Sequence, residues 1–228
     1  MLTLMRLVVR IGGSVVASPL NPRLIDEYAE VLKILRKQKH QVGVVVGGGA
    51  YAREFIRAAR EMGLEEKVQD EVAIFVSRIF AHLLTRRLGA LSCESVPVTI
   101  DEAVECLNGG KTAVMGGLRP GITTDAVAAL LAEGMNAELY VKATDQDGIC
   151  NKDPKKFTDA VKLDHLSWGE LSRILTEAGH KAGMHQVLDP EAVRLLRKGK
   201  VKVVVVNGLR VENVLHAVEG RRVGTLVD

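Results

Sequence analysis

Val44-Val45-Val46-Gly47-Gly48-Gly49-Ala50-Tyr51-Ala52-Arg53 is a run of β-branched residues that ends in three glycines and continues into an amphipathic segment. Such a run is typical of a buried parallel strand, and the glycines predict a tight turn into a helix. The same order recurs where Gly12-Gly13-Ser14 follows an apolar run at 7–11, and where Gly116-Gly117 follows one at 112–115. Strands alternating with helices predict an α/β fold, a three-layer αβα sandwich with a mainly parallel central sheet.

The rest of the chain continues this alternation. Asn21 before Pro22 predicts a helix start, because asparagine caps helices and proline suits their first position. Gly63 and Gly89 predict helix ends. We expect strands at 7–11, 42–46, 112–115, 138–142, 201–206 and 223–227, and helices at 22–37, 50–62, 72–88, 124–133 and near 171, 192 and 214.

The amino-acid composition limits the kinds of ligand or macromolecule that the protein is expected to bind. Of the 228 residues, 47% are hydrophobic, 26% charged and 4% aromatic. The net charge of +3 is too small to indicate DNA or RNA binding, and scarce aromatics argue against a base-stacking surface. Arg6 and Arg10 interrupt the apolar N-terminal segment, so we expect no signal peptide, and no apolar run reaches membrane-spanning length. We therefore expect a small anionic ligand and no nucleic-acid or membrane partner.

The cysteines are Cys93, Cys106 and Cys150. They are odd in number, widely spaced and form no CxxC pair, so the sequence indicates neither a disulfide framework nor a zinc site. A reducing cytoplasm is the expected location.

The three glycine clusters follow predicted strands, where α/β proteins collect their ligands. Glycine lets backbone N–H groups turn toward an anion, so the clusters predict phosphate binding. Gly109-Gly110-Lys111-Thr112 resembles the end of a Walker A loop, but a strand rather than a helix follows it. Gly47 to Ala52 matches a loose dinucleotide fingerprint, although no acidic residue ends the next strand. An NAD-dependent enzyme therefore stays open as an alternative.

Polar residues near these clusters each have a functional and a structural interpretation. Arg53 lies one turn past Gly49, where it can clamp a phosphate or simply be solvated. Asp70 can accept hydrogen bonds from a ribose or cap the next helix. In Thr123-Thr124-Asp125, one hydroxyl can cap the helix and the other contact a phosphate, while the aspartate suits the first turn. Asp145 and Asp147-Gly148 indicate an Mg²⁺-linked carboxylate, a hairpin turn, or both.

Together these motifs resemble the amino-acid-kinase superfamily, and within it the archaeal type of UMP kinase. The most specific match is 120–133, Pro-Gly-Ile-Thr-Thr-Asp-Ala-Val-Ala-Ala-Leu-Leu-Ala-Glu, which is close to the family pattern P-G-H-T-T-D-A-V-A-A-L-L-A-E. The other matches, in chain order, are 11–15, 44–49 with Ala52-Arg53, 143–148 with Asp153-Pro154, 181–183 with 187–190, and Gly220 with Gly224-Thr225.

The resemblance implies a single domain, residues 1–228, with an acceptor lobe at about 1–140 and an ATP lobe at about 141–228. It implies ATP-dependent phosphorylation of UMP with Mg²⁺, and a homohexamer built from dimers. The implied catalytic residues are Arg10, Asp145 and Asp189. The implied UMP-binding residues are Gly47, Gly48, Arg53, Asp70, Leu118, Arg119, Pro120, Gly121, Ile122, Thr123 and Thr124. The implied ATP-binding residues are Gly12, Gly13, Ser14, Gly49, Arg53, Thr144, Asp145, Gly148, Cys150 and Asp153.

The chain departs from the family pattern at the positions expected to contact the bases. Cys150 replaces an aromatic residue, Ile122 replaces a histidine, and Phe80 replaces an asparagine. Arg10 stands where many superfamily members have lysine. Two alternatives therefore stay open: a kinase of this fold for an alcohol phosphate, a carboxylate or an aminomethyl-furan phosphate, and a non-catalytic nucleotide-binding, storage or regulatory protein. Lys142, Lys152 and Lys181 are equal candidates for a cation at the transferred phosphoryl group.

Overall fold

A computed structural model of the chain describes residues 4–154, 156–180 and 188–228. Within these residues a seven-stranded sheet has the order β3-β2-β1-β4-β8-β9-β7, parallel except where β8 meets β9. The strands are β1 Arg6–Ile11, β2 Gln41–Val46, β3 Ala113–Met115, β4 Leu139–Thr144, β7 His165–Leu166, β8 Lys202–Asn207 and β9 Thr225–Val227. The prediction of a mainly parallel sheet is confirmed.

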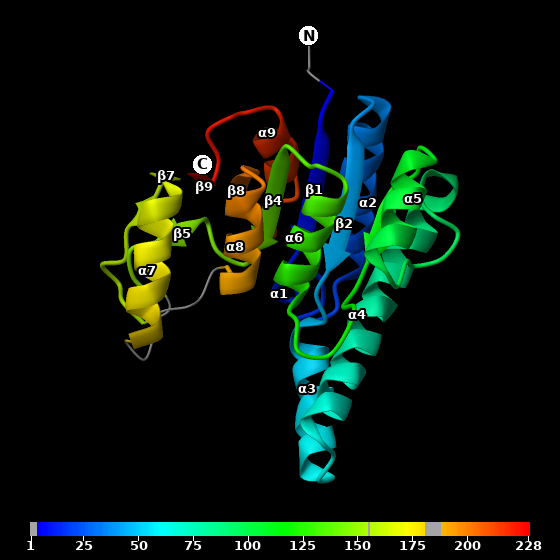
Figure 1. Cartoon of the computed structure of the whole chain (residues 1–228), viewed down its shortest axis with the longest axis horizontal. Coiled ribbons are helices and arrows are strands. Elements are labelled where there is room, and N and C mark those ends of the chain that lie inside the picture. Colours follow the sequence, from blue (N-terminus) through cyan, green and yellow to red (C-terminus); the bar gives the residue numbers. More distant parts are fainter. Residues whose placement is uncertain (1–3, 155, 181–187) are drawn as a thin grey trace.

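Helices cover both faces of this sheet, which makes three layers (Figure 1). One face packs on α1 Gly13–Val16, α2 Pro22–Lys37, α3 Gly49–Glu61, α4 Glu66–Leu88 and α9 Glu212–Val218. The other packs on α5 Ile100–Asn108, α6 Thr124–Gly134, α7 Trp168–His180 and α8 Pro190–Lys198. Neighbouring residues such as Val8 and Val9 enter opposite cores, which explains why the central strands are apolar throughout.

Several predicted elements have different bounds. Helix α4 begins at Glu66, six residues before the predicted 72, because its first residues are mostly polar and show no apolar period. Asp70 therefore lies inside α4, and the interpretation of Asp70 as an N-cap is wrong. The hairpin predicted at Asp147-Gly148 is also absent from the described strands: β5 Ile149–Cys150 pairs with β6 Lys162–Leu163, while β4 pairs with β1 and β8.

The cysteine expectation requires a correction. Cys93 and Cys106 form a disulfide, with their Cα atoms 6.0 Å apart, and Cys150 is free. Cys93 follows the short 3₁₀ helix η1 (Gly89–Leu91), and Cys106 lies on α5. The turn that leads from α5 into β3 brings the chain back beside Ser92, which pairs with Thr112. Sequence spacing does not show this return of the chain.

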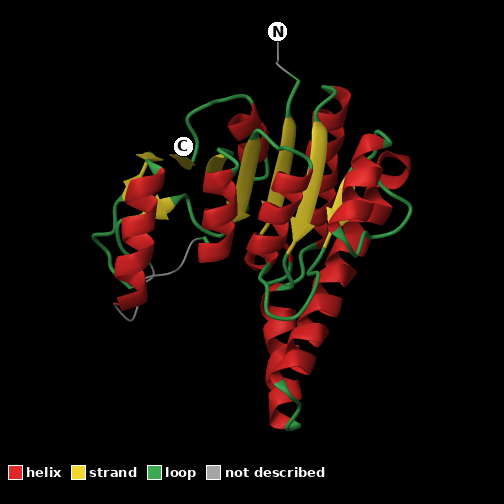
Figure 2. Ribbon diagram, in the orientation of Figure 1, coloured by secondary structure: helices red, strands yellow, loops and turns green. Residues whose placement is uncertain are grey.

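Helices α3 and α4 form an antiparallel pair that projects beyond the sheet (Figure 2). The turn between them contains Gly63 in the left-handed region, with φ 73°. Among the described residues, no helix combines the length and apolar character needed to cross a membrane.

Candidate active site

The glycine turns meet at one edge of the sheet. Strands β1, β2, β3 and β4 run parallel, so their carboxyl ends lie side by side. Figure 2 shows loops gathered at these strand ends, beside the start of the projecting α3–α4 pair. The loops are 12–14 after β1, 47–49 after β2, 116–124 after β3 and 145–148 after β4. The edge predicted to hold phosphates is thus formed by four loops.

The first two loops are packed backbone against backbone. A Cβ added to Gly13 would lie 2.0 Å from the amide nitrogen of Gly49, so no side chain can be placed there. Gly49 itself has φ 60° and begins α3. Gly47 N–H donates to the Ile11 carbonyl at 3.0 Å, and Gly12 N–H donates to the Ala143 carbonyl at 2.8 Å. The glycines therefore fix one continuous surface at the start of α3, where the Ala50 N–H donates to Ser18 Oγ at 2.7 Å and to the Ala17 carbonyl at 3.1 Å.

A buried cluster of charges lies beside this surface. Arg10 on β1 and Lys142 on β4 occupy paired positions in the sheet, and both contact Asp125 in the first turn of α6. Arg10 Nε lies 2.7 Å from Asp125 Oδ1, and Lys142 Nζ donates to Asp125 Oδ2. Arg10 Nη2 also donates to Thr124 Oγ1 at 2.9 Å. The charge of Asp189 also acts on Lys142, and a backbone hydrogen bond links Asp189 to the Asp125 carboxylate, so two carboxylates accompany the two cations.

The environment shifts the pKa values of this cluster. Burial raises the pKa of Asp125, but the charges of Arg10 and Lys142 outweigh it and hold that pKa below its ordinary value. Burial lowers the pKa of Lys142 to about 8, and the charge of Asp125 opposes part of this change. Lys142 therefore stays charged at neutral pH because Asp125 is ionised beside it. Lys142 loses its proton more easily than an exposed lysine does.

This cluster separates the three lysine candidates. Lys142 belongs to the cluster, whereas Lys152 pairs with Asp159 at 2.5 Å on the surface, and Lys181 lies outside the described residues. Asp125, interpreted from the sequence as a helix-start residue, is the anion that Arg10 and Lys142 share. The sequence did contain a signal, because Arg10 and Lys142 are charged residues inside otherwise apolar strands.

Two side chains of α4 hold the loop that follows β3. Arg78 Nε donates to the Gly117 carbonyl at 3.0 Å, and its Nη2 donates to the Leu118 carbonyl at 3.1 Å. Asp70 Oδ2 accepts from Gly121 N–H at 2.8 Å, where Gly121 has φ 82°. Thr123 caps α6 by accepting from Ala126 N–H at 3.1 Å. The structure thus brings Asp70 together with loop 118–124.

The sequence did not indicate that Arg78 anchors this loop. Ser77 Oγ accepts from Gly117 N–H at 2.7 Å, so this turn of α4 fixes the loop start.

Arg53 is exposed on α3 one turn past Gly49, which leaves its guanidinium available at the same edge.

Five of the residues predicted to hold ATP lie between the end of β4 and the segment that follows β5. Thr144 ends β4, and its hydroxyl donates to Asp145 Oδ1 at 3.3 Å. Asp153 is buried, and Cys150 is half-buried on β5, where burial raises the pKa of its thiol. Asp189 lies at the start of α8 and accepts from Glu191 and Ala192 amides at 2.8 and 3.1 Å. Asp189 thus caps the helix that packs on α6.

The described residues contain no group of three or more His, Cys, Asp or Glu side chains placed to hold a metal ion. Mg²⁺ in nucleotide sites is usually held by phosphate oxygens, water and only one or two carboxylates. The donors at this edge therefore suit a metal that is bound together with a nucleotide.

A mainly parallel αβα sandwich with glycine turns and a cluster of charged side chains at the strand ends is typical of phosphate-binding α/β proteins. Within that class, the profile described as "Amino acid kinase family" matches residues 5–207. The chain belongs to this family, which confirms the resemblance found in the sequence.

The relatives include two archaeal uridylate kinases. That of Methanocaldococcus jannaschii is 42% identical over 226 residues, covering 98% of this chain and 100% of the relative. That of Archaeoglobus fulgidus is 40% identical over 223 residues, covering 98% and 100%. A crystal structure of the Archaeoglobus fulgidus uridylate kinase matches with a TM-score of 0.88 at 39% identity, covering 98% and 100%. A Bacillus anthracis UMP kinase structure, at 22% identity and a TM-score of 0.82 over 98% and 96%, shares the fold.

Proposed function

We propose that this chain transfers the γ-phosphoryl group of ATP to UMP and releases ADP and UDP, a step of pyrimidine nucleotide biosynthesis. The observation that carries the proposal is the Arg10–Asp125–Lys142 cluster, which places buried positive charge where the glycine loops meet. The uridylate kinase relatives, at about 40% identity over nearly the whole chain, identify the acceptor that this edge would take.

UMP is placed on the acceptor side of the edge. Its phosphate would lie between the 47–49 turn, loop 118–124 and Arg53, with Asp70 at the same loop. ATP would lie across the 12–14 turn and Gly49, with its other end in the loop after β4 (Thr144, Asp145, Gly148, Cys150 and Asp153). The two phosphates would then meet beside Arg10 and Lys142. The proposal keeps an acceptor lobe at about 1–140 and an ATP lobe at about 141–228, with the 12–14 turn and Gly49 of the first lobe reaching the triphosphate.

The proposed chemistry needs no general base. The phosphate of UMP has a second pKa of about 6, so most of it has lost both protons at neutral pH. One of its ionised oxygens can attack the γ-phosphorus of ATP without first losing a proton. A new P–O bond forms to UMP as the bond to the ADP oxygen breaks. Catalysis then consists of alignment and charge neutralisation in a loose transition state. Arg10 and Lys142 supply positive charge, Asp125 holds both in place, and Asp189 organises the start of α8 nearby.

Mg²⁺ is proposed to bind with ATP, chiefly through phosphate oxygens, with Asp145 as the adjacent carboxylate. When bound, it would neutralise charge on the β- and γ-phosphates. Because both substrates are cytoplasmic metabolites, we place the activity in the cytoplasm.

The proposal includes assembly into a homohexamer built from dimers. Helix α4 carries Phe75, Ile79 and Leu83 four residues apart, with 62%, 59% and 42% of each side chain exposed. Residues at this spacing share one helix face, and an apolar face of this kind favours burial against a second copy. Phe75→Glu is expected to lower the mass measured by light scattering, and an unchanged mass would contradict this surface as the contact.

The test of function is an ADP-release assay with ATP and Mg²⁺ against UMP, CMP, dUMP, AMP, isopentenyl phosphate and amino acids. Strong turnover with UMP alone is expected. Turnover only with another acceptor would mean that Cys150, Ile122 and Phe80 mark a changed substrate. Nucleotide binding without turnover of any acceptor would favour a non-catalytic binding protein. Either of the last two results would contradict the proposal.

A further inference from the structure

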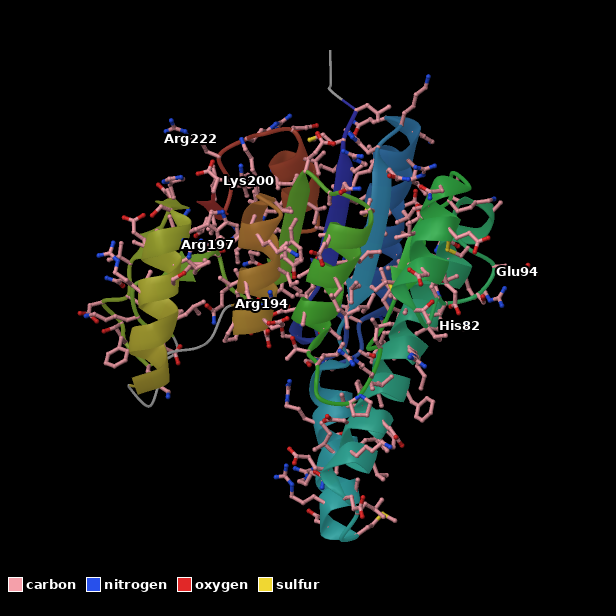
Figure 3. All side chains as sticks on the ribbon, in the orientation of Figure 1. His82, Glu94, Arg194, Arg197, Lys200 and Arg222 are labelled. Carbon is pink, nitrogen blue, oxygen red and sulfur yellow. A yellow bond between two sulfur atoms is a disulfide. The ribbon has the colours of Figure 1, made fainter. Side chains whose placement is uncertain are left out.

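A cavity with charged lining residues lies at the edge of the sheet opposite the glycine loops. It has a volume of about 920 Å³ and is lined where β4 and β8 begin and β9 passes beside them. Helix α9 and the 219–224 loop close one side. Arg222, on this loop, lies at the end of the molecule remote from the α3–α4 pair (Figure 3). The cavity is therefore separate from the glycine loops.

The cavity combines an apolar floor with a basic rim. Leu139, Val204 and Leu226 are among the apolar side chains that line it. The basic residues of the lining are Lys162, His165, Lys202, Arg221 and Arg222. An apolar floor with charged groups at one side is the usual composition of a small-molecule site, and the volume lies within the range of such sites.

The acidic residues of the rim are already neutralised. Glu138 lies 3.7 Å from Arg6, and Asp164 lies 2.8 Å from Lys162. Among the residues that the structure describes, Lys202 and Arg222 have no ion-pair partner, and both are exposed. Arg222 acts on Asp164 only through its longer-range charge, so the rim presents two cations that no carboxylate of the described residues contacts directly.

We propose that this cavity binds an organic phosphate of nucleotide size, with the phosphates on Lys202 and Arg222 and the organic body on the apolar floor. Inorganic phosphate would leave the floor unfilled, and an uncharged ligand would leave the two cations unpaired. Arginine and lysine are the side chains that proteins use for phosphate recognition. The site goes beyond the proposed function, because UMP and ATP are both placed at the other edge.

The cavity wall also touches the predicted ATP loop. A Cβ added to Gly148 would lie 3.2 Å from Lys162 Cγ and 3.2 Å from the Gly224 carbonyl carbon, and both residues line the cavity. Lys162 Nζ donates to the Gly224 carbonyl at 3.2 Å. A ligand that attracts the Lys162 ammonium would shift a side chain packed on Gly148. Occupancy is therefore expected to change the KM for ATP.

The test is calorimetric titration of the full chain with each ribonucleoside triphosphate, after a uridine–adenosine pentaphosphate has filled both substrate sites. One further site per chain is expected. In Lys202→Gln/Arg222→Gln its Kd should rise by at least about tenfold. The matched pair Lys37→Gln/Lys200→Gln removes the same charge outside the cavity lining and should bind like the unaltered protein.

No further binding of any of the four nucleotides up to about 1 mM, or equal binding by both double variants, would overturn the site. Inorganic triphosphate binding as tightly as the nucleotides would overturn the role of the apolar floor. An unchanged KM for ATP in the presence of bound ligand would overturn the link to Gly148. If the pentaphosphate does not bind, the proposed function fails, and the same comparison of variants without it still tests the cavity.

Discussion

The positively charged side chains at the two ends of the parallel strands differ in how far they are buried. At the carboxyl ends, Lys142 is buried, Arg10 is half-buried, and both contact Asp125. At the amino ends, Lys202 and Arg222 are exposed at the rim of a cavity. Removing an ion from water costs on the order of several kcal/mol, so Lys142 depends on the nearby carboxylates of Asp125 and Asp189. The exposed cations at the amino ends keep their hydration and need no such partners.

The largest expected effect comes from removing the shared anion. Asp125→Asn removes the negative charge that both Arg10 and Lys142 contact, so kcat should fall by about 10²–10³-fold. The free energy of unfolding should fall by about 3–5 kcal/mol, because one partner of a buried network is lost. Glu133→Gln, at the exposed end of the same helix, is the matched control and should behave like the unaltered protein. A kcat within threefold of that of the unaltered protein would contradict the account.

The next effect concerns the acceptor loop. Asp70→Ala removes the acceptor for Gly121 N–H and should raise the KM for UMP about tenfold, with little change for ATP. Asp70→Asn retains an acceptor oxygen and should lose less. Glu66→Ala, exposed on the same helix, is the control in the same steady-state assay. An equal rise of the KM for UMP and the KM for ATP would show that Asp70 does not act specifically on the acceptor site.

Raising the pH should lower kcat, because Lys142 lies at the carboxyl ends of the strands, where the phosphates are expected to meet. Because burial lowers the pKa of Lys142 to about 8, its positive charge disappears as the pH rises through that value. We expect kcat to fall about tenfold per pH unit above it. Lys142→Arg keeps its charge to higher pH, so any activity it retains should stay constant over the same range. A kcat for the unaltered protein that does not change up to about pH 10 would show that Lys142 is not needed as a cation.

Lowering the pH should reduce the stability of the folded protein through His40, which lies at the amino ends of the strands. This effect should be smaller than the effects described above. His40 precedes β2, is fully buried, and accepts from Met5 N–H at 3.1 Å through Nδ1. Burial lowers the pKa of His40 below its ordinary value of 6.5. The unfolded chain thus takes up a proton that the folded chain resists. Stability is complete above pH 6.5 and declines as the pH falls from there toward the lower pKa of the folded protein.

Thermal unfolding measured from neutral to acid pH tests this histidine. His40→Gln should reduce the decline, while kcat at neutral pH should change little. A decline of the same size in the variant would assign the acid sensitivity to other groups.

The sequence predicted best where one local signal was sufficient. Asn21 caps α2, which spans 22–37 as expected, and the glycine turns follow β1, β2 and β3. The start of α4, the β5–β6 pair and the Cys93–Cys106 disulfide depend on contacts between distant segments, so no local pattern indicated them. The assignment of individual residues to UMP or ATP stays a prediction.

The charge cluster shows the same limit within the site. Arg10 was singled out from the sequence, but Asp125 was interpreted as part of a helix start, and Lys142 was not distinguished from Lys152. The register of β1 against β4 brings Arg10 and Lys142 together, and the position of α6 places Asp125 between them. Such a cluster is a property of strand order, which residue spacing alone does not determine.

The most direct measurement is a crystal structure of the chain with UMP, Mg²⁺ and a non-hydrolysable ATP analogue. The account predicts UMP phosphate between the 47–49 turn and loop 118–124, and the triphosphate across Gly13 and Gly49. The two phosphates should meet beside Arg10 and Lys142. UMP bound away from these loops, or phosphates that do not approach the Arg10–Asp125–Lys142 cluster, would contradict it.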